Sequence, residues 1–286
     1  MKIEFVASSG AAEILAVLAH EGRALAGAGS ALDQAASGAL AKAMKNSRFT
    51  GAANSTLNVA APAGIDANAV LLVGAGAADK LDDLAVETAA AAAYQATKLS
   101  GAEVLTIEAS HLSPELAARA GFAVRLAAYR FAKYLTKQKA DKIPSVTTVR
   151  VVTSDVKAAE AAFQPLSAVA DAVLFSRDLV SEPANILYPA EFARRVKELE
   201  ALGAKVEILG EAEMKKLGMG SLLGVGQGSV RESQLAVIQW NGGKAGEAPI
   251  AFVGKGVCFD TGGISLKPAD GMAVSYTHLR AHETEA

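Results

Sequence analysis

The stretch Val253-Gly-Lys-Gly-Val-Cys-Phe-Asp-Thr-Gly-Gly-Ile-Ser-Leu-Lys-Pro268 combines two lysines and an aspartate with four glycines, directly after the apolar run Ile250–Val253. Glycine allows the backbone conformations that are closed to other residues and lets it approach a ligand closely. A strand that leads into such a loop is where α/β proteins tend to place their chemistry. The stretch therefore predicts an α/β fold with a functional loop after Val253.

Three charged residues of this stretch are candidates for chemistry. Asp260 follows Phe259, and an ionised carboxylate in apolar surroundings needs a metal, an arginine or several N–H donors. Burial lowers the pKa of a lysine, so Lys255, between two glycines, is a candidate metal ligand as a neutral amine. Lys267 is a candidate for a fixed positive charge directed at a developing oxyanion. The plainer alternative is a loop with solvent-facing lysines and an aspartate that caps its own turn.

The whole string resembles the signature of the leucyl (cytosol) aminopeptidase family, VGKG-x-x-FD-[ST]-GG-[IL]-[ST]-[IL]-KP. Members of that family are two-metal exopeptidases. The resemblance implies that Lys255 and Asp260 bind metal and that Lys267 is catalytic. It further implies two divalent ions, Mn²⁺ or Zn²⁺, and peptide substrates with a leucine-like first residue. A cytoplasmic homohexamer is also implied for the full-length protein.

Three further stretches resemble the same family, in the family's order. Tyr129–Tyr134 is similar to the end of a helix in its N-terminal domain. Arg177–Asn185, followed by Pro189, is similar to the helix and turn that open its catalytic domain. Gly224–Ser229 and the strand to Trp240 are similar to the segment before the signature. The resemblance implies a macrodomain-like α/β domain over residues 1–157 and part of a metallo-aminopeptidase catalytic domain over residues 158–272.

The family pattern breaks off after Met272. Ser275 and His278 stand where a substrate-pocket methionine and a metal-binding aspartate are expected, and no Asp-x-Glu-Gly-Arg motif follows. We therefore expect a C-terminally truncated chain that is inactive and prone to aggregate by itself, with residues 273–286 as a non-native tail. His278 and His282 have a helical spacing found among zinc ligands, but the zincin order of residues is absent, and we expect no metal role.

Composition narrows the class of protein. The net charge of −2 and the pI near 6.1 give no reason to expect nucleic acid or an anionic membrane surface as a partner. No apolar run approaches the length of a membrane span. The single cysteine, Cys258, excludes an intrachain disulfide and fits the cytosol.

Strand-like and helix-like segments alternate along the chain, which predicts a mostly parallel sheet with helices on its faces. The predicted strands include Lys2–Ala7, Ile14–Leu18, Thr56–Ala60, Ala69–Val73, Glu103–Ile107, Val146–Val152, Lys205–Leu209, Gln234–Trp240 and Ile250–Val253. The predicted helices include Ala31–Met44, Asp79–Lys98, one that begins at Ser113-Pro114, a long one from about Ala158 to Val180, and Pro189–Leu202.

An alternative function is a non-catalytic, macrodomain-like ligand-binding module in the N-terminal half. His20 at the end of a predicted strand and His111 before a helix cap are more typical of satisfied or solvent-facing histidines than of ligands. The glycines of Gly224-Val-Gly-Gln-Gly228 resemble a phosphate cradle but lack the Gly-Lys-Ser/Thr of a P-loop. We expect them to allow a close backbone approach instead.

Overall fold

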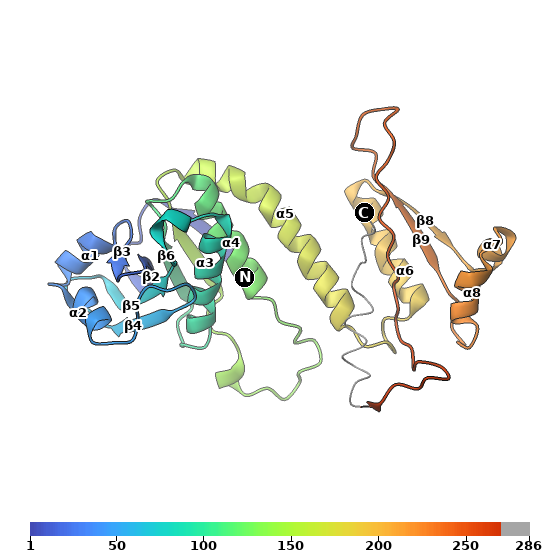
Figure 1. The fold of residues 1–286 in the computed structure, drawn as a ribbon, viewed down its shortest axis with the longest axis horizontal. Coiled ribbons are helices and arrows are strands. Elements are labelled where there is room, and N and C mark those ends of the chain that lie inside the picture. Colours follow the sequence, from blue (N-terminus) through green and yellow to red (C-terminus); the bar gives the residue numbers. More distant parts are fainter. Residues whose placement is uncertain (270–286) are drawn as a thin grey trace. The chain divides into compact units, whose positions relative to one another are not determined.

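The computed structural model describes residues 1–269, which divide into a first unit that ends at Phe175 and a second that begins at Ser176 (Figure 1). The first unit contains a seven-stranded sheet. Its path runs β1 (Lys2–Val6), β7 (Thr148–Val152), β6 (Val104–Glu108), β2 (Ala12–His20), β5 (Ala67–Gly74) and β4 (Thr56–Ala60), while β3 (Ala24–Leu25) pairs with β2. The pairs from β1 to β5 along this path are parallel, and only β4 and β3 pair antiparallel. The predicted mostly parallel α/β sheet is confirmed.

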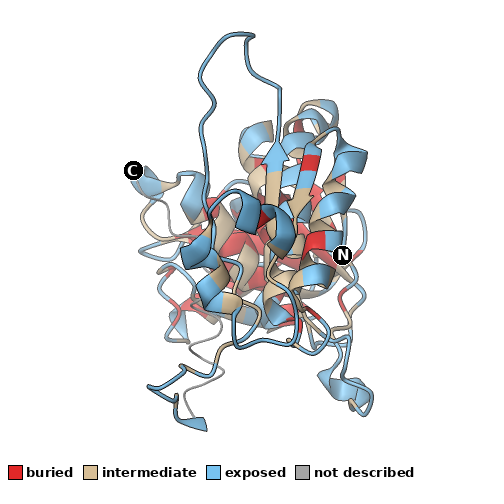
Figure 2. Cartoon of the chain, turned by 90° about the vertical axis from the view of Figure 1, so that its right-hand side faces the viewer, coloured by how far each residue is buried: buried red, intermediate tan, exposed pale blue. Residues whose placement is uncertain are grey.

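Strand β2 shows why the sheet needs cover on both faces. Its residues alternate between two apolar clusters: Ile14, Ala16 and Leu18 belong to one, and Leu15 and Val17 belong to the other. A parallel strand in the middle of a sheet is buried on both faces, so it is a continuous apolar run rather than an alternating one. Figure 2 shows this buried centre in red.

Helices supply the cover on the two faces. The first cluster takes side chains from α3 (Asp83–Thr97), α4 (Pro114–Ala127) and the start of α5 (Val156–Ser181), and the second takes them from α1 (Gly29–Ala35) and α2 (Ala39–Lys45). Two of the helices begin at side-chain caps. Asp82 accepts a hydrogen bond from the backbone N–H of Ala85, and Ser113 accepts one from that of Leu116.

Two predicted helical segments differ from the structure. The segment predicted as one helix over 31–44 is two helices, because Ser37 and Gly38 have φ values of 51° and 79° and end α1. The Asp33 carboxylate then accepts hydrogen bonds from the N–H groups of Leu40 and Ala41 and opens α2. The 129–134 segment, expected at a helix end, lies beyond α4, which ends at Ala127.

The second unit contains the end of α5 and a smaller set of elements. They are α6 (Pro189–Lys197), a 3₁₀ turn (Glu198–Leu202), β8 (Lys205–Leu209), α7 (Glu211–Lys216), α8 (Gly220–Gly226) and β9 (Leu235–Gln239). Strands β8 and β9 form an antiparallel pair. The domain boundary predicted after residue 157 falls within α5 and stays a prediction. Within residues 1–269, no helix is long and apolar enough to cross a membrane.

The predicted strand Ile250–Val253 is wrong for the described chain. These residues have no regular structure, and Ile250, Phe252 and Val253 are exposed. A strand exists only where a neighbouring strand takes up its N–H and C=O groups, and no described strand pairs with this segment.

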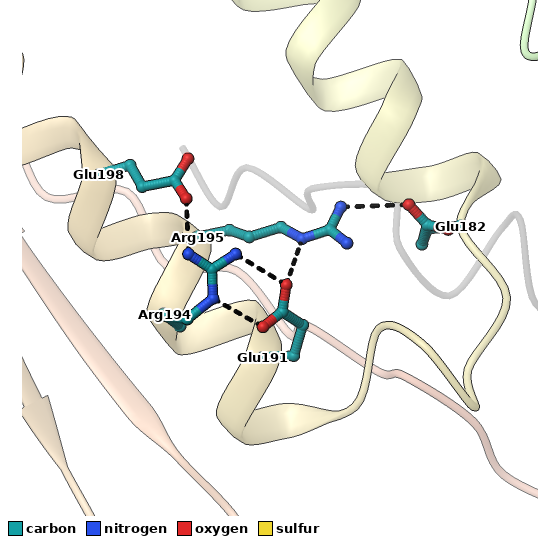
Figure 3. A network of polar contacts seen from close by, with 5 residues as sticks. All are labelled: Glu182, Glu191, Arg194, Arg195 and Glu198. Carbon is teal, nitrogen blue, oxygen red and sulfur yellow. Dashed lines mark hydrogen bonds and ion pairs between the residues drawn. The ribbon is translucent and has the colours of Figure 1, made fainter. Parts of the chain in front are cut away.

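A network of ion pairs joins the end of α5 to α6 (Figure 3). The Glu182 side chain, 1% exposed, pairs with Arg195, whose Nη1 lies 3.2 Å from Glu182 Oε2. Arg195 Nε also donates to Glu191 at 2.8 Å, and Arg194 Nε donates to the other Glu191 oxygen at 2.7 Å. A buried carboxylate needs such a cation. The network therefore fixes where α6 lies relative to the turn that precedes it.

The buried pair predicts that Arg195→Met destabilises the second unit by about 3 kcal/mol, since loss of one partner leaves a buried charge. The value is at the low end of the usual range because the Arg195 side chain is 16% exposed. Arg194→Met, on the same helix but 58% exposed, is the matched control and should cost much less stability, because solvent screens an exposed ion pair. Urea unfolding followed by the fluorescence of Trp240, the single tryptophan, measures both. Equal losses in the two variants would contradict the assignment.

The same network predicts an acid-sensitive contribution to stability. Hydrogen bonds from Arg194 and then Arg195 lower the pKa of Glu191 from 4.5 to about 2. A carboxyl whose folded pKa lies below its unfolded pKa stabilises the fold above pH 4.5, and this contribution disappears as the pH falls towards 2. Glu191→Gln should therefore lose less stability than the unchanged protein over that interval. The measurement is the urea concentration at the unfolding midpoint as a function of pH. Parallel curves for Glu191→Gln and the unchanged protein would refute the predicted contribution of Glu191.

Candidate functional site

The loop after residue 253 brings two of the three predicted site residues into direct contact. Lys267 Nζ lies 2.8 Å from Asp260 Oδ1, and the side chains are 21% and 41% exposed. The same carboxylate oxygen accepts a hydrogen bond from the backbone N–H of Gly262 at 2.9 Å. The sequence alone predicted an aspartate that needs a cation or N–H donors, and Asp260 has both.

This contact sets the protonation of the aspartate. The hydrogen bond from Lys267 is the main cause that lowers the pKa of Asp260 below its usual value, and the Gly262 N–H adds to it. Partial burial opposes the shift. Lys255 also lowers the pKa of Asp260 through its positive charge. Lys255 and Lys267 therefore both lie within electrostatic reach of Asp260, which is ionised at neutral pH.

Backbone geometry closes the loop around this pair. The N–H of Lys267 donates to the carbonyl of Thr261 at 2.9 Å, which brings the two ends of the turn together. Gly262 has a φ of 89°, and an added Cβ would lie 2.2 Å from the carbonyl oxygen of Ser265. Only glycine is compatible with both conditions. The glycine at 262 is thus required by the turn that presents Asp260 and Lys267.

A second glycine fixes the start of the loop against α6. An added Cβ at Gly256 would lie 2.8 Å from the ring of Phe192, so the loop backbone lies directly on that ring. The contact links the site to the helix that the Glu182–Arg195 pair holds. Cys258 is partly buried, and its Sγ lies 3.9 Å from the Gly256 carbonyl oxygen, within the same turn. The sequence contained no signal that would have singled out Phe192 for this role.

The glycines before β9 lie partly in a helix, since Gly224 and Gly226 belong to α8. An added Cβ at Gly226 would lie 2.0 Å from the Ser233 hydroxyl oxygen, while nothing lies within 4 Å of one at Gly224. The close approach expected here is therefore found at Gly226.

The two described histidines belong to the first unit, at the carboxyl ends of its strands. His20 ends β2, and His111 follows β6, whose last residue is the buried Glu108. The imidazole of His111 lies against Gly27, where an added Cβ would be 2.2 Å from Nδ1. Burial lowers the pKa of His111, Glu108 opposes this, and His20 adds to it. Among residues 1–269, the buried Nδ1 of His20 has no hydrogen-bond partner. His278 and His282 lie outside the described residues.

Sequence comparison places both units in one family. A profile of the N-terminal domain of the cytosol aminopeptidase family matches residues 16–138, and a profile of its catalytic domain matches residues 174–277. A protein named probable cytosol aminopeptidase from Caulobacter vibrioides is 58% identical over 276 residues, covering 95% of this chain and 56% of that protein. One of the same name from Rhizobium meliloti is 51% identical, covering 82% and 48%. The chain spans about half the length of these curated relatives.

Solved structures agree with this placement. A bottromycin maturation enzyme has a TM-score of 0.67 at 26% identity, covering 94% of this chain and 56% of that one. A tomato leucine aminopeptidase mutant has a TM-score of 0.77 at 22% identity, covering 98% and 59%, which shows the shared fold. Because two profiles of one family together match most of the chain, in order and across both units, the chain belongs to the cytosol aminopeptidase family.

Proposed function

We propose that the whole protein is a metal-dependent aminopeptidase that removes leucine-like N-terminal residues from peptides. The observation that carries the proposal is the contact of Lys267 with Asp260, within reach of the charge of Lys255, in a loop of the matched catalytic domain. These are the residues that the signature assigns to metal binding and catalysis. A cytoplasmic homohexamer remains part of the proposal, and the names of the relatives support the cytosol.

The described residues do not by themselves fit a two-metal centre. Within residues 1–269, no group of three or more His, Cys, Asp and Glu side chains could hold a metal ion. Asp260 already accepts hydrogen bonds from Lys267 and Gly262. Lys255 and Asp260 would contribute only two ligands, so two Mn²⁺ or Zn²⁺ ions need side chains from elsewhere. A second structure of the bottromycin maturation enzyme, in complex with Mn, supports manganese as the metal.

Lys267 has a role that its own charge can supply. Amide hydrolysis passes through a tetrahedral oxyanion, and a positive charge held beside the scissile carbonyl stabilises that oxyanion more than the ground state. Asp260 and the closed turn restrict where the Lys267 ammonium lies. A charge that is already oriented costs little reorganisation during the reaction, which is why we assign Lys267 this role. The chain alone, with an incomplete ligand set, should be inactive.

The test is a fusion in which residues 1–272 are followed by the portion of the Caulobacter vibrioides relative beyond the matched region. With Mn²⁺ it should hydrolyse leucine-p-nitroanilide, and Lys267→Met should lower kcat by about 100- to 1,000-fold, as for loss of an oxyanion donor. Lys244→Met, 88% exposed in the same unit, should leave kcat unchanged. A folded but inactive fusion would refute the aminopeptidase, and hydrolysis by the 286-residue chain alone would refute its inactivity.

The ligand-binding module remains a second candidate for the first unit. The chain leaves β2 through α1 and α2 on one face of the sheet, and it leaves the neighbouring strand β6 through α4 on the other face. The crevice between two strands whose connections leave to opposite faces is called a topological switch point. Open α/β sheets bind their ligands there. His20, Glu108 and His111 lie at this edge. Titration of ADP-ribose by calorimetry separates the candidates: heat of binding that His111→Asn abolishes supports the module, and absence of heat excludes this ligand.

A further inference from the structure

Strand β4 forms one outer edge of the seven-stranded sheet (Figure 1). It pairs antiparallel with β5, and no strand of the described residues lies on its other side. At one end of the strand, the N–H of Gly74 donates to the Ser55 carbonyl at 2.8 Å. At the other end, the N–H of Ala61 donates to the Asn68 carbonyl at 2.8 Å. Bonded and non-bonded residues alternate along an antiparallel pair, so every second residue of β4 has its N–H and C=O groups on the open edge.

The residues with outward backbone groups also border a groove. They are Thr56, Asn58 and Ala60, and their side chains are exposed. Asn58 pairs in register with Leu71, which belongs to the apolar cluster under α3, so these side chains lie on the α3 face of the sheet. A groove of about 630 Å³ lies on this face between α3 and the start of β4. Its lining is uncharged and consists of Asn54, Thr56, Thr88, Ala91, Ala92, Gln95 and Ala96.

The two outer edges of the sheet differ in how they are protected. An edge strand with charged side chains resists pairing with another chain. The opposite edge, β1, has this protection: Lys2 pairs with Glu4 at 2.6 Å, and Glu4 pairs with Arg150 at 3.1 Å. Strand β4 has the sequence Thr-Leu-Asn-Val-Ala and carries no charge. It is therefore the edge that remains open to a further strand.

The chemistry of this edge specifies its occupant. Alternating N–H and C=O groups are matched by another extended backbone, and the side chains of an added strand would point alternately into the groove and away from it. The alanine methyl groups of the lining favour apolar side chains there. Leu84, 68% exposed, lies one helical turn before Thr88 and adds apolar surface to the same side of α3.

A second copy of β4 fits the groove less well. In a symmetric pair of edges, the side chains that enter the groove would again be those on the α3 face of β4, which are the short Thr56, Asn58 and Ala60. These side chains fill little of a groove of about 630 Å³. A separate peptide with longer apolar side chains fills it better, and an empty gap beside the strand would forfeit contacts.

We propose that β4 binds an extended, uncharged polypeptide segment of a partner as an additional strand, with apolar side chains of that segment in the groove beside α3. This surface lies within the first unit, and its role does not depend on the proposed peptidase activity.

The first experiment uses the peptide Gln-Leu-Thr-Leu-Thr-Leu-Gln, amidated at its C-terminus and carrying a fluorophore on its N-terminus, which prevents aminopeptidase cleavage. Fluorescence anisotropy should rise to a plateau as the 286-residue chain is added. The same peptide with every amide N-methylated keeps its side chains but lacks N–H donors, and it should bind at least about 10-fold more weakly. Binding that does not saturate, or equal binding of the two peptides, overturns the proposal.

Variants of the chain test the edge and the groove separately. Asn58→Pro removes an N–H that does not bond to β5, a position where edge strands tolerate proline, and should weaken binding about 10-fold. Asn58→Thr keeps this N–H and is the matched control with unchanged affinity. Ala96→Gln places a longer side chain in the groove and should also weaken binding about 10-fold. Ala161→Gln, at an exposed alanine of α5 outside the groove lining, is its control.

The outcomes distinguish the occupants. Equal affinities of Asn58→Pro and Asn58→Thr would overturn the strand pairing, and equal affinities of Ala96→Gln and Ala161→Gln would overturn the role of the groove. Light scattering also measures the mass of the 286-residue chain without peptide. A dimer that Asn58→Pro converts to a monomer would assign the edge to a second copy and overturn the proposal.

Discussion

A strand that is apolar on both sides must be paired at both edges and covered on both faces, and the two units differ in whether this condition is met. In the first unit, β2 is paired with β5 and β6, and its two faces are covered by separate apolar clusters. In the second, Ile250–Val253 has the same character but no strand partner among the described residues. The loop that holds the candidate site follows this unpaired segment. The candidate site therefore follows an apolar segment whose backbone groups no described strand takes up.

Two carboxylates illustrate how local contacts and long-range contacts differ. Glu182 is fully buried and is held by Arg195 from a separate helix, so this pair joins two elements. Asp260 is paired with Lys267 from its own turn and with the N–H of Gly262. The second pair closes a loop but joins no elements. This is why the loop has a defined internal geometry and yet does not form a metal centre with the described residues.

Local patterns predicted most elements because their causes are local. Apolar runs identified β2 and β5, and Ser113-Pro114 identified the start of α4 through its cap. The break between α1 and α2 was missed, because alanine-rich sequence favours one helix and the positive φ at Ser37 conflicts with that preference. The contact of Gly256 with Phe192 was also missed. The two residues are 64 positions apart, and a single sequence contains no pattern that indicates which distant residues are in contact.

The sequence by itself determined the family and the α/β class, and it suggested the candidate site residues, because a signature string and the period of apolar residues are properties of short segments. The tertiary structure alone decided that Lys267 and Asp260 are in contact, that Phe192 supports the loop and that Ile250–Val253 has no described strand partner. Each of these depends on which segments meet in space. Pairing and burial require a second surface, and a single segment cannot specify whether that surface is present.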